Sequence, residues 1–474
     1  MKILFIYKNF YIYEFKGIPQ LAAILKKEGH EVRLALSEKE DVLKIIKKWK
    51  PDIVGYSITT GFHRYYLNLN KRLKEKVKFY SIFGGPHATY FPEIINEEGV
   101  DAVCIGEGDE AMVDFVNAFG TKRMRYIKNW LVKDNGKIYK NDVRPLIEDL
   151  DKLPFLDREL LYSKDNFLKN NLLKTFIFSR GCFNRCTYCH NASYLEIYKN
   201  KGKIFRTRSP ESAVSEIELV KKNYPVGIVR FNDDFFGISQ DWLREFCKKY
   251  KEKINLPFHC AIAVNTATEE RIKLLKEAGC VSLQLGLETG VEEMRNKLIK
   301  KWFKNEQYIR ACKLLNKYGI KVILNNIIGL PGESVDTVLE TLRFNIKCKP
   351  FYSWCTIYQP YPKTPLAEFA QKKGYFDGDY DKVDHSYYRY SILKFKNKNE
   401  KRQIENLHKL FAITVSFPFL YPITRQLIKL PPNLIFNLIY KIWYGYTHQY
   451  LFPQKMRVLQ RLKTIKRFFV KDEA

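Results

Sequence analysis

The sequence contains no hydrophobic run of the roughly 20 residues that a membrane-spanning helix requires. Residues 411–446 are rich in aromatic and aliphatic side chains, but Pro418, Pro422, Pro431 and Pro432 interrupt them. The opening residues, MKILFIY, form too short an apolar stretch for a signal peptide and are soon followed by polar residues. These absences predict a cytoplasmic protein without a membrane-spanning helix.

The chain has only ten cysteines in 474 residues, which are too few for a disulfide scaffold. Seven of them occur singly and are expected to be reduced core thiols: Cys104, Cys247, Cys260, Cys280, Cys312, Cys348 and Cys355. Reduced thiols agree with a cytoplasmic location.

Acidic residues are few, since 52 Asp and Glu oppose 81 Lys and Arg and leave a formal net charge of +29. Such a charge fits nucleic acid, an anionic membrane surface, or a Lys-rich composition without a specific partner. The chain has no signature of an RNA- or DNA-binding module, so nucleic acid is not the expected partner. An RNA-binding protein would bind polyanions with an affinity that falls steeply with salt.

Length and composition predict a globular protein of two or three domains, with 46% hydrophobic and 28% charged residues. Residues 1–120 alternate short apolar strands with helical segments, which predicts an α/β, doubly wound Rossmann-like parallel sheet. Six strand–helix units in residues 172–372 predict a partial (β/α)6 barrel like that of a TIM barrel. Residues 121–171 predict a hairpin and linker, and residues 373–474 a helical, aromatic and basic C-terminal region.

Three cysteines, Cys182, Cys186 and Cys189, have the spacing C-x3-C-x2-C and follow a predicted strand at residues 175–178. Three thiolates so close together can bind three irons of a [4Fe–4S] cluster and leave the fourth iron open for a ligand. The alternatives are a zinc knuckle and three unrelated buried thiols. Zinc needs a fourth Cys or His, and His190 is badly placed because it directly follows Cys189.

With Tyr188 before its third cysteine, this motif resembles the signature of the radical S-adenosylmethionine (SAM) enzymes. The resemblance continues at later strand ends, in NDD at residues 232–234, GLETG at 286–290, GLPGE at 329–333 and YPKTP at 361–365, where Lys363 replaces the family's usual glycine. It implies that SAM is bound by Tyr188, Asp233, Asp234, Glu288, Asn326 and Gly329. Asn325 and Asn326 lie within a predicted strand at residues 321–328. Each of these residues alone has an ordinary alternative as a helix cap or a turn.

Three loops rich in Gly, Ser and Thr follow predicted strands of the first domain, at residues 57–61, 84–89 and 106–110. Placed before a radical SAM motif, they resemble the cobalamin-binding domain of the cobalamin-dependent branch of that family. The resemblance implies a cofactor site formed by Ser57, Thr59, Thr60, Gly84, Gly85, Gly106, Glu107 and Gly108.

One feature of many cobalamin domains is missing: residues 12–17, IYEFKG, replace the D-x-H-x-x-G motif whose His binds cobalt from below. A Rossmann-like domain that has lost its cofactor, or that binds another nucleotide, is the alternative. His87, in the second loop, either faces the cofactor or caps a turn.

The resemblance implies an enzyme whose [4Fe–4S] cluster cleaves SAM to a 5′-deoxyadenosyl radical, with cobalamin as the second cofactor in the methylation of an unactivated carbon. Relatives use the same parts for cyclisation or rearrangement. The alternative of a different class is a non-catalytic cobalamin- or nucleotide-binding sensor, or an RNA-binding protein. The cluster also implies an electron donor such as a flavodoxin or ferredoxin.

The aromatic and basic C-terminal region favours a hydrophobic or lipid-like substrate. A tetrapyrrole, a natural-product intermediate and a peptide are the alternatives. Its last part, residues 454–471, predicts a basic amphipathic tail suited to peripheral contact with an anionic membrane. The alternative for the region is a helical cap over the barrel mouth.

Overall fold

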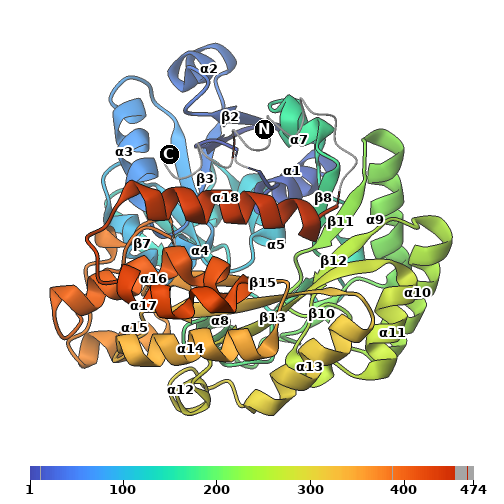
Figure 1. Ribbon diagram of the computed structural model, residues 1–474. Helices are drawn as coiled ribbons and strands as arrows, with labels where there is room; N and C mark the ends of the chain where they lie inside the picture. Colours follow the sequence, from blue (N-terminus) through green and yellow to red (C-terminus); the bar gives the residue numbers. More distant parts are fainter. Residues whose placement is uncertain (11, 387, 454–466, 468–474) are drawn as a thin grey trace.

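The computed structural model describes residues 1–10, 12–386, 388–453 and 467. The predicted amphipathic tail at residues 454–471 therefore lies outside the described residues, except for Arg467. Figure 1 shows the first sheet with its helices beside a second, strongly curved sheet, and helix α18 (Leu434–Leu451) crossing the front of the view.

The first sheet has the strand order β2-β1-β3-β4-β5-β6-β7, parallel through β5 and antiparallel in the last two pairings. Its strands are β1 (Lys2–Tyr7), β2 (Glu31–Leu36), β3 (Ile53–Ser57), β4 (Tyr80–Gly84), β5 (Ala102–Cys104), β6 (Trp130–Asp134) and β7 (Lys137–Lys140). The order reverses between β1 and β3, so ligands are expected at the carboxyl ends of these strands. The predicted doubly wound sheet is confirmed.

Helices cover both faces of this sheet because each helix has one apolar side. α1 (Gly17–Lys27) and α5 (Asp109–Ala118) pack on one face, and α2 (Val42–Trp49) and α3 (His63–Lys74) on the other. The short helices of this half are α4 (Pro86–Tyr90), α6 (Glu159–Tyr162) and α7 (Asn166–Asn170).

The second sheet is a partial barrel of parallel strands in the order β15-β14-β13-β12-β11-β8. Its strands are β8 (Leu173–Phe176), β11 (Ile228–Phe231), β12 (Phe258–Ala261), β13 (Cys280–Glu288), β14 (Lys321–Ile328) and β15 (Tyr352–Ile357), and β9 (Ser179–Arg180) pairs separately with β10 (Arg206–Thr207). The helices are α8 (His190–Ile197), α9 (Pro210–Asn223), α10 (Gln240–Lys253), α11 (Glu269–Ala278), α12 (Glu292–Lys297), α13 (Asn305–Lys317), α14 (Val335–Cys348) and α15 (Pro365–Lys372).

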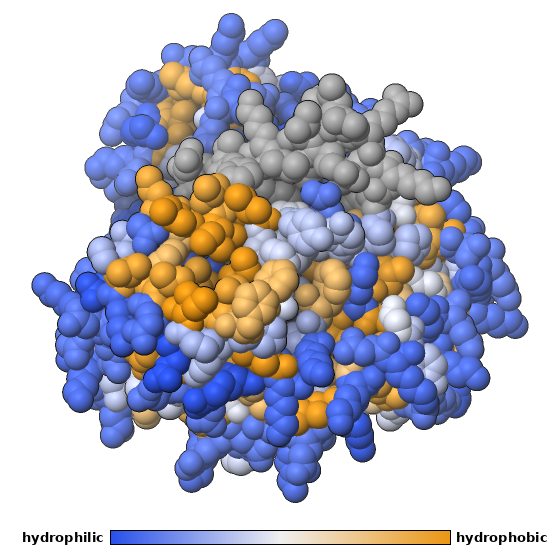
Figure 2. Space-filling model, in the orientation of Figure 1, coloured by the Kyte–Doolittle hydropathy of each residue, from blue (hydrophilic) through white to orange (hydrophobic). Residues whose placement is uncertain are grey.

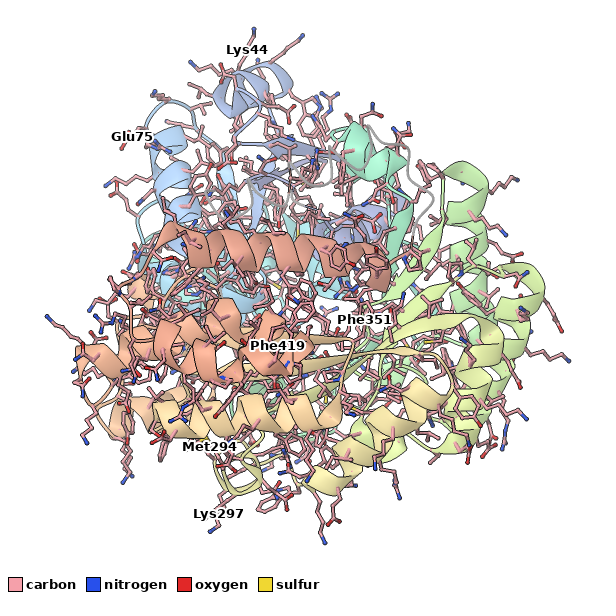
Figure 3. The ribbon with its side chains drawn as sticks, viewed as in Figure 1. Lys44, Glu75, Met294, Lys297, Phe351 and Phe419 are labelled. Atoms are coloured by element: carbon pink, nitrogen blue, oxygen red, sulfur yellow. The ribbon has the colours of Figure 1, made fainter. Side chains whose placement is uncertain are left out.

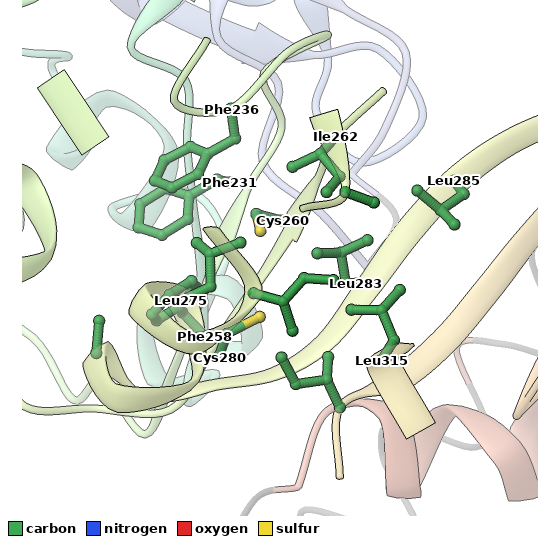
Figure 4. Packing of buried hydrophobic residues seen from close by; sticks show 14 of the residues in the cluster. Phe231, Phe236, Phe258, Cys260, Ile262, Leu275, Cys280, Leu283, Leu285 and Leu315 are labelled. Carbon is green, nitrogen blue, oxygen red and sulfur yellow. The ribbon is translucent and has the colours of Figure 1, made fainter. Parts of the chain in front are cut away.

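The core of the barrel lies between the strands and their outer helices. Figure 4 shows Phe258, Cys260 and Leu283 from β12 and β13 facing Leu275 of α11 and Leu315 of α13. Strand residues of the other parity face the barrel interior instead, because side chains alternate along a strand. That interior is where the polar residues of the candidate site lie.

The C-terminal region is helical, with α16 (Lys398–Ser416), α17 (Tyr421–Leu427) and α18. The buried side of α18 carries Tyr444 and Leu451, which pack with Leu173, Ile228 and Tyr352 at the starts of β8, β11 and β15. The predicted cap thus closes the amino ends of the strands, not the mouth at their carboxyl ends. No helix in the described ranges has the length and apolarity needed to cross a membrane.

The loop after β1 joins the two halves of the molecule through a buried carboxylate. Glu14 accepts hydrogen bonds from the backbone N–H and the hydroxyl of Thr175, at 2.9 and 2.6 Å, and forms an ion pair with Arg158 at 3.1 Å. Burial alone would raise the pKa of Glu14, but Arg158, Lys174 and these hydrogen bonds lower it to about 2. The carboxylate therefore contributes stability above its ordinary pKa of 4.5, and this stability is lost as the pH falls towards 2.

We predict that Glu14→Gln lowers the free energy of unfolding by about 3–5 kcal/mol at neutral pH, because Arg158 loses its closest counter-ion inside the protein. Urea unfolding followed by circular dichroism measures the change. Glu293→Gln, in the exposed ion pair with Lys297, is the matched control and should leave stability unchanged. Equal stabilities of the two variants would contradict a role for Glu14 in holding the halves together.

Candidate active site

The cysteine motif lies in a loop held at its base by the β9–β10 pair. Gly181 begins the loop with a φ of +82°, and a side chain there would overlap the carbonyl oxygen of Ile204. The loop ends at Cys189, which caps α8 and accepts a hydrogen bond from the backbone N–H of Asn191 at 3.5 Å. Only glycine fits the first position, and the helix cap aims the last sulfur inward.

The three cysteines line one cavity of about 410 Å³ inside the barrel mouth. Burial raises the pKa of Cys182, Cys186 and Cys189 to about 12, 11 and 12, so free thiolates are disfavoured there. Bound iron would stabilise the thiolates, and N–H groups such as that of Asn191 point at sulfur as they do around clusters. These residues fit a [4Fe–4S] cluster.

The residues around the motif are less suited to a single metal ion, such as zinc, than to a cluster. Among the residues that the structure describes, no three Cys, His, Asp or Glu side chains converge as one metal ion would need. In a [4Fe–4S] cluster the three thiolates bind different irons, so this convergence is not required. His190, the only His beside the motif, instead stacks on Tyr90 with the ring centroids 4.4 Å apart.

Asp233, at the end of β11, positions the start of the cysteine loop. Its Oδ1 accepts hydrogen bonds from the backbone N–H groups of Phe178 and Ser179, at 2.9 and 2.6 Å, and from the Ser179 hydroxyl at 2.6 Å. Burial raises its pKa to about 6 against the effect of these hydrogen bonds. β8 ends at Phe176, two residues before the predicted strand end, and the backbone N–H of Phe178 is bonded to Asp233.

Other predicted SAM-binding residues also line the cysteine cavity, namely Tyr188, Asp234 and Glu288. Asp234 accepts a hydrogen bond from the Asn191 side chain at 2.9 Å. Glu288 has a φ of +68° and pairs with Lys301 at 2.6 Å, which holds its carboxylate in one position. The sequence reasoning missed Lys301, because it lies in the connection between α12 and α13 and belongs to no recognisable motif.

Two predicted SAM-binding residues lie elsewhere. Asn326 faces α14, where it exchanges hydrogen bonds with the Asn345 amide at 3.1 and 2.7 Å, and it does not line the cavity. Its neighbour Asn325 lines the cavity instead, because adjacent strand residues face opposite sides. Gly329 does not line the cysteine cavity either and lies near Phe395 and Ile404 of the C-terminal region.

A second cavity, of about 360 Å³, opens at the carboxyl ends of the first sheet and reaches the barrel. Six predicted cofactor-binding residues line it: Ser57, Gly84, Gly85, Gly106, Glu107 and Gly108. Apolar side chains such as Leu21, Met112 and Trp130 form its inner wall. An apolar cavity bordered by glycine loops and polar groups suits a large cofactor with an aromatic end, so these residues fit cobalamin.

Thr59 and Thr60 do not line this cavity. Thr59 is exposed, and buried Thr60 hydrogen-bonds Nδ1 of His87 at 2.9 Å. His87 itself stacks on His63 at 4.1 Å, so it joins two loops rather than facing the cavity. At residues 12–17, Glu14 occupies the place of the missing His and is turned towards the barrel.

Glu107 connects the second cavity with the cysteine loop. It pairs with Arg206 at 2.6 Å and Arg180 at 3.1 Å, from the two strands at the base of the loop, and accepts the Tyr194 hydroxyl at 2.7 Å. The hydroxyl of Tyr198 reaches Gly106 so closely that a side chain there would overlap it. The predicted cofactor loop is therefore also a contact between the two halves, in addition to the loop that carries Glu14.

A third cavity, of about 400 Å³, adjoins the cysteine cavity and shares four of its lining residues, Tyr188, Arg230, Gln284 and Asn325. Half of its eight other lining residues are aromatic, namely Trp354, Tyr358, Tyr361 and Tyr388. Arg230 stacks on the rings of Tyr13 and Phe452, at 4.8 and 5.4 Å. Its Nε has no hydrogen-bond partner in the described part of the chain, and no carboxylate there pairs with it.

Comparison with known proteins agrees with this geometry. The family model of the radical SAM superfamily matches residues 176–344, and that of the B12 binding domain matches residues 11–116. An uncharacterized methyltransferase of Pyrococcus horikoshii is 31% identical over 367 residues, which cover 75% of this chain and 78% of the relative. The anaerobic magnesium-protoporphyrin IX monomethyl ester cyclase of Rubrivivax gelatinosus is 27% identical over 408 residues, with coverages of 80% and 71%.

Two solved structures have the same fold at 16% sequence identity. The radical SAM methyltransferase TsrM from Kitasatospora setae gives a TM-score of 0.65 and covers 79% of this chain and 76% of its own. The cobalamin-dependent SAM radical enzyme OxsB, with aqua-cobalamin and SAM bound, gives 0.64 with coverages of 100% and 75%.

The neighbouring residues Asn325 and Asn326 give a matched pair of variants. We predict that Asn326→Ala costs about 1–3 kcal/mol of unfolding free energy, because it removes two buried hydrogen bonds with the Asn345 amide. Asn325→Ala should leave stability within about 0.5 kcal/mol of wild type and slow the reductive cleavage of SAM. Urea unfolding measures the change in stability, and the rate of 5′-deoxyadenosine release measures SAM cleavage. If Asn326→Ala slows SAM cleavage and Asn325→Ala does not, Asn326 belongs to the SAM site.

Proposed function

This chain belongs to the cobalamin-dependent radical SAM enzymes, and from that premise we propose that it methylates an unactivated carbon of a hydrophobic or lipid-like substrate. The observation that carries the proposal is the aromatic-walled cavity that adjoins the cysteine cavity. A substrate bound there lies next to the site of SAM cleavage. Cyclisation or rearrangement, as in the related cyclase, is the alternative reaction.

The bound cofactors supply the electron that cleaves SAM and the cobalt that carries a methyl group. The protein supplies position and exclusion of water. Cys182, Cys186 and Cys189 hold the cluster, and Glu288, fixed by Lys301, binds a hydroxyl or ammonium group of SAM. Asn325 lies where the two barrel cavities meet, so it contacts SAM, the substrate or both.

The substrate carries an acidic group in addition to its apolar part. Arg230 supports this step, because its guanidinium lines both barrel cavities and pairs with no carboxylate in the described ranges. Contacts with Tyr13 and Phe452 hold the cation in place without neutralising it. A carboxylate or phosphate of the substrate supplies the missing counter-ion.

Electrons come from a separate protein, because the motif provides for one cluster with three cysteine ligands. A small acidic redox protein such as a flavodoxin or ferredoxin suits the formal charge of +29.

The test of methyl transfer uses the protein loaded anaerobically with iron, sulfide and cobalamin, SAM with a deuterated methyl group, and small molecules from a strain lacking the gene. We predict release of 5′-deoxyadenosine and a product with three deuterium atoms, read by mass spectrometry. Cys186→Ala should abolish both. 5′-Deoxyadenosine without any labelled product would favour cyclisation or rearrangement, and 5′-deoxyadenosine from Cys186→Ala would contradict the cluster assignment.

Variants of Arg230 distinguish a role in substrate binding from a role in SAM cleavage. We predict that Arg230→Met retains release of 5′-deoxyadenosine without substrate but forms the labelled product more than about tenfold more slowly, because a charge-assisted hydrogen bond is lost. Arg230→Lys should restore part of the rate, and exposed Arg244→Met should behave as wild type. If Arg230→Met loses SAM cleavage even without substrate, the residue binds SAM instead.

A further inference from the structure

The outer side of the C-terminal helices carries an exposed apolar face. Leu434 is 84% exposed, Phe419 73% and Ile435 66%. We define this apolar face as Phe419, Ile423, Leu434, Ile435, Leu438, Ile442, Tyr446 and Tyr450, all exposed. Figure 2 shows hydrophobic surface gathered in this region, and Figure 3 labels Phe419 near its centre.

Among the described residues, the apolar face is exposed along one side of α18. Leu434, Leu438, Ile442, Tyr446 and Tyr450 follow one another at intervals of four residues and so form one stripe along α18. The other side of the helix, with Phe436, Tyr444, Thr447, His448 and Leu451, is buried. Scattered exposed apolar residues are ordinary, but a continuous stripe beside Phe419 and Ile423 marks an interaction surface.

Charge identifies the kind of surface that this face meets. Residues 406–471 contain no Asp or Glu and eleven Lys or Arg. Within the described residues, Arg425 and Lys429 lie on and directly after α17, and Lys441 lies on α18. Apolar and aromatic side chains on a segment whose charged residues are all basic complement a bilayer of anionic lipids, in which the chains bury apolar groups and the headgroups attract cations.

We propose that the apolar face docks the protein on an anionic lipid bilayer, with α18 lying in the plane of the membrane interface. Tyr446 and Tyr450 suit the headgroup level, since their rings are apolar and their hydroxyls polar. The docking is peripheral and leaves the buried side of α18 against the barrel.

The test measures co-sedimentation of the full chain with vesicles of equimolar phosphatidylglycerol and phosphatidylcholine, and with vesicles of phosphatidylcholine alone. We predict preferential binding to the anionic vesicles that weakens with added salt. Leu434→Ser/Leu438→Ser/Ile442→Ser should weaken it by more than about tenfold, because three apolar side chains no longer enter the bilayer. Arg425→Glu/Lys429→Glu should weaken binding to the anionic vesicles with little effect on folding, which circular dichroism checks.

The matched control is Tyr126→Ser/Ile138→Ser/Leu219→Ser, which removes three exposed apolar side chains from other elements and should bind as wild type. Three results would overturn the proposal: no binding to anionic vesicles, equal binding by the Leu434 triple variant, or equal loss in the control. A dimer in analytical ultracentrifugation that the Leu434 triple variant abolishes would also overturn it, because a second copy would then cover the face.

Discussion

Glu107 is the carboxylate on which the two halves of the molecule converge. It follows β5 of the first sheet and pairs with Arg180 and Arg206, which lie opposite each other on β9 and β10. Arg180 also reaches Asp109 at the start of α5, at 2.7 Å. Since β9 and β10 form the base of the cysteine loop, one group of charges links the cysteine loop to the loops predicted to bind cobalamin. An enzyme with two cofactors needs the distance between them fixed, because a reacting group displaced by an ångström loses much of its rate.

Contacts between the two halves also occupy the position of the histidine that is missing from residues 12–17. In the loop after β1, Glu14 bonds Thr175 of β8 and Arg158, while Tyr13 of the same loop stacks on Arg230 in the barrel interior. These contacts come from the position at which many cobalamin domains carry the histidine. The first domain thus contributes both an anchor and part of the wall around the candidate substrate site.

The sequence alone predicted features that depend on local patterns. The strand at residues 321–328 coincides with β14, because its apolar pattern and flanking turns suffice to define it. The cysteine motif and most glycine loops also reach the predicted cavities. Sequence patterns do not reveal which side of a strand a residue faces. They led to Asn326, whereas in the structure Asn325 lines the cavity and Asn326 bonds Asn345. They also gave no sign of Lys301 and Arg230, which lie in no motif.

The C-terminal region shows why composition alone left its role open. Its aromatic and basic residues were compatible with a cap or with a membrane surface, and α18 separates the two by side: Tyr444 and Leu451 face the strand starts, whereas Leu434 and Ile442 face outward. One helix can serve both roles because a period of 3.6 residues divides its surface into independent faces. Docking through the outer face would then place the barrel, with its aromatic cavity, beside the phase in which an apolar substrate dissolves.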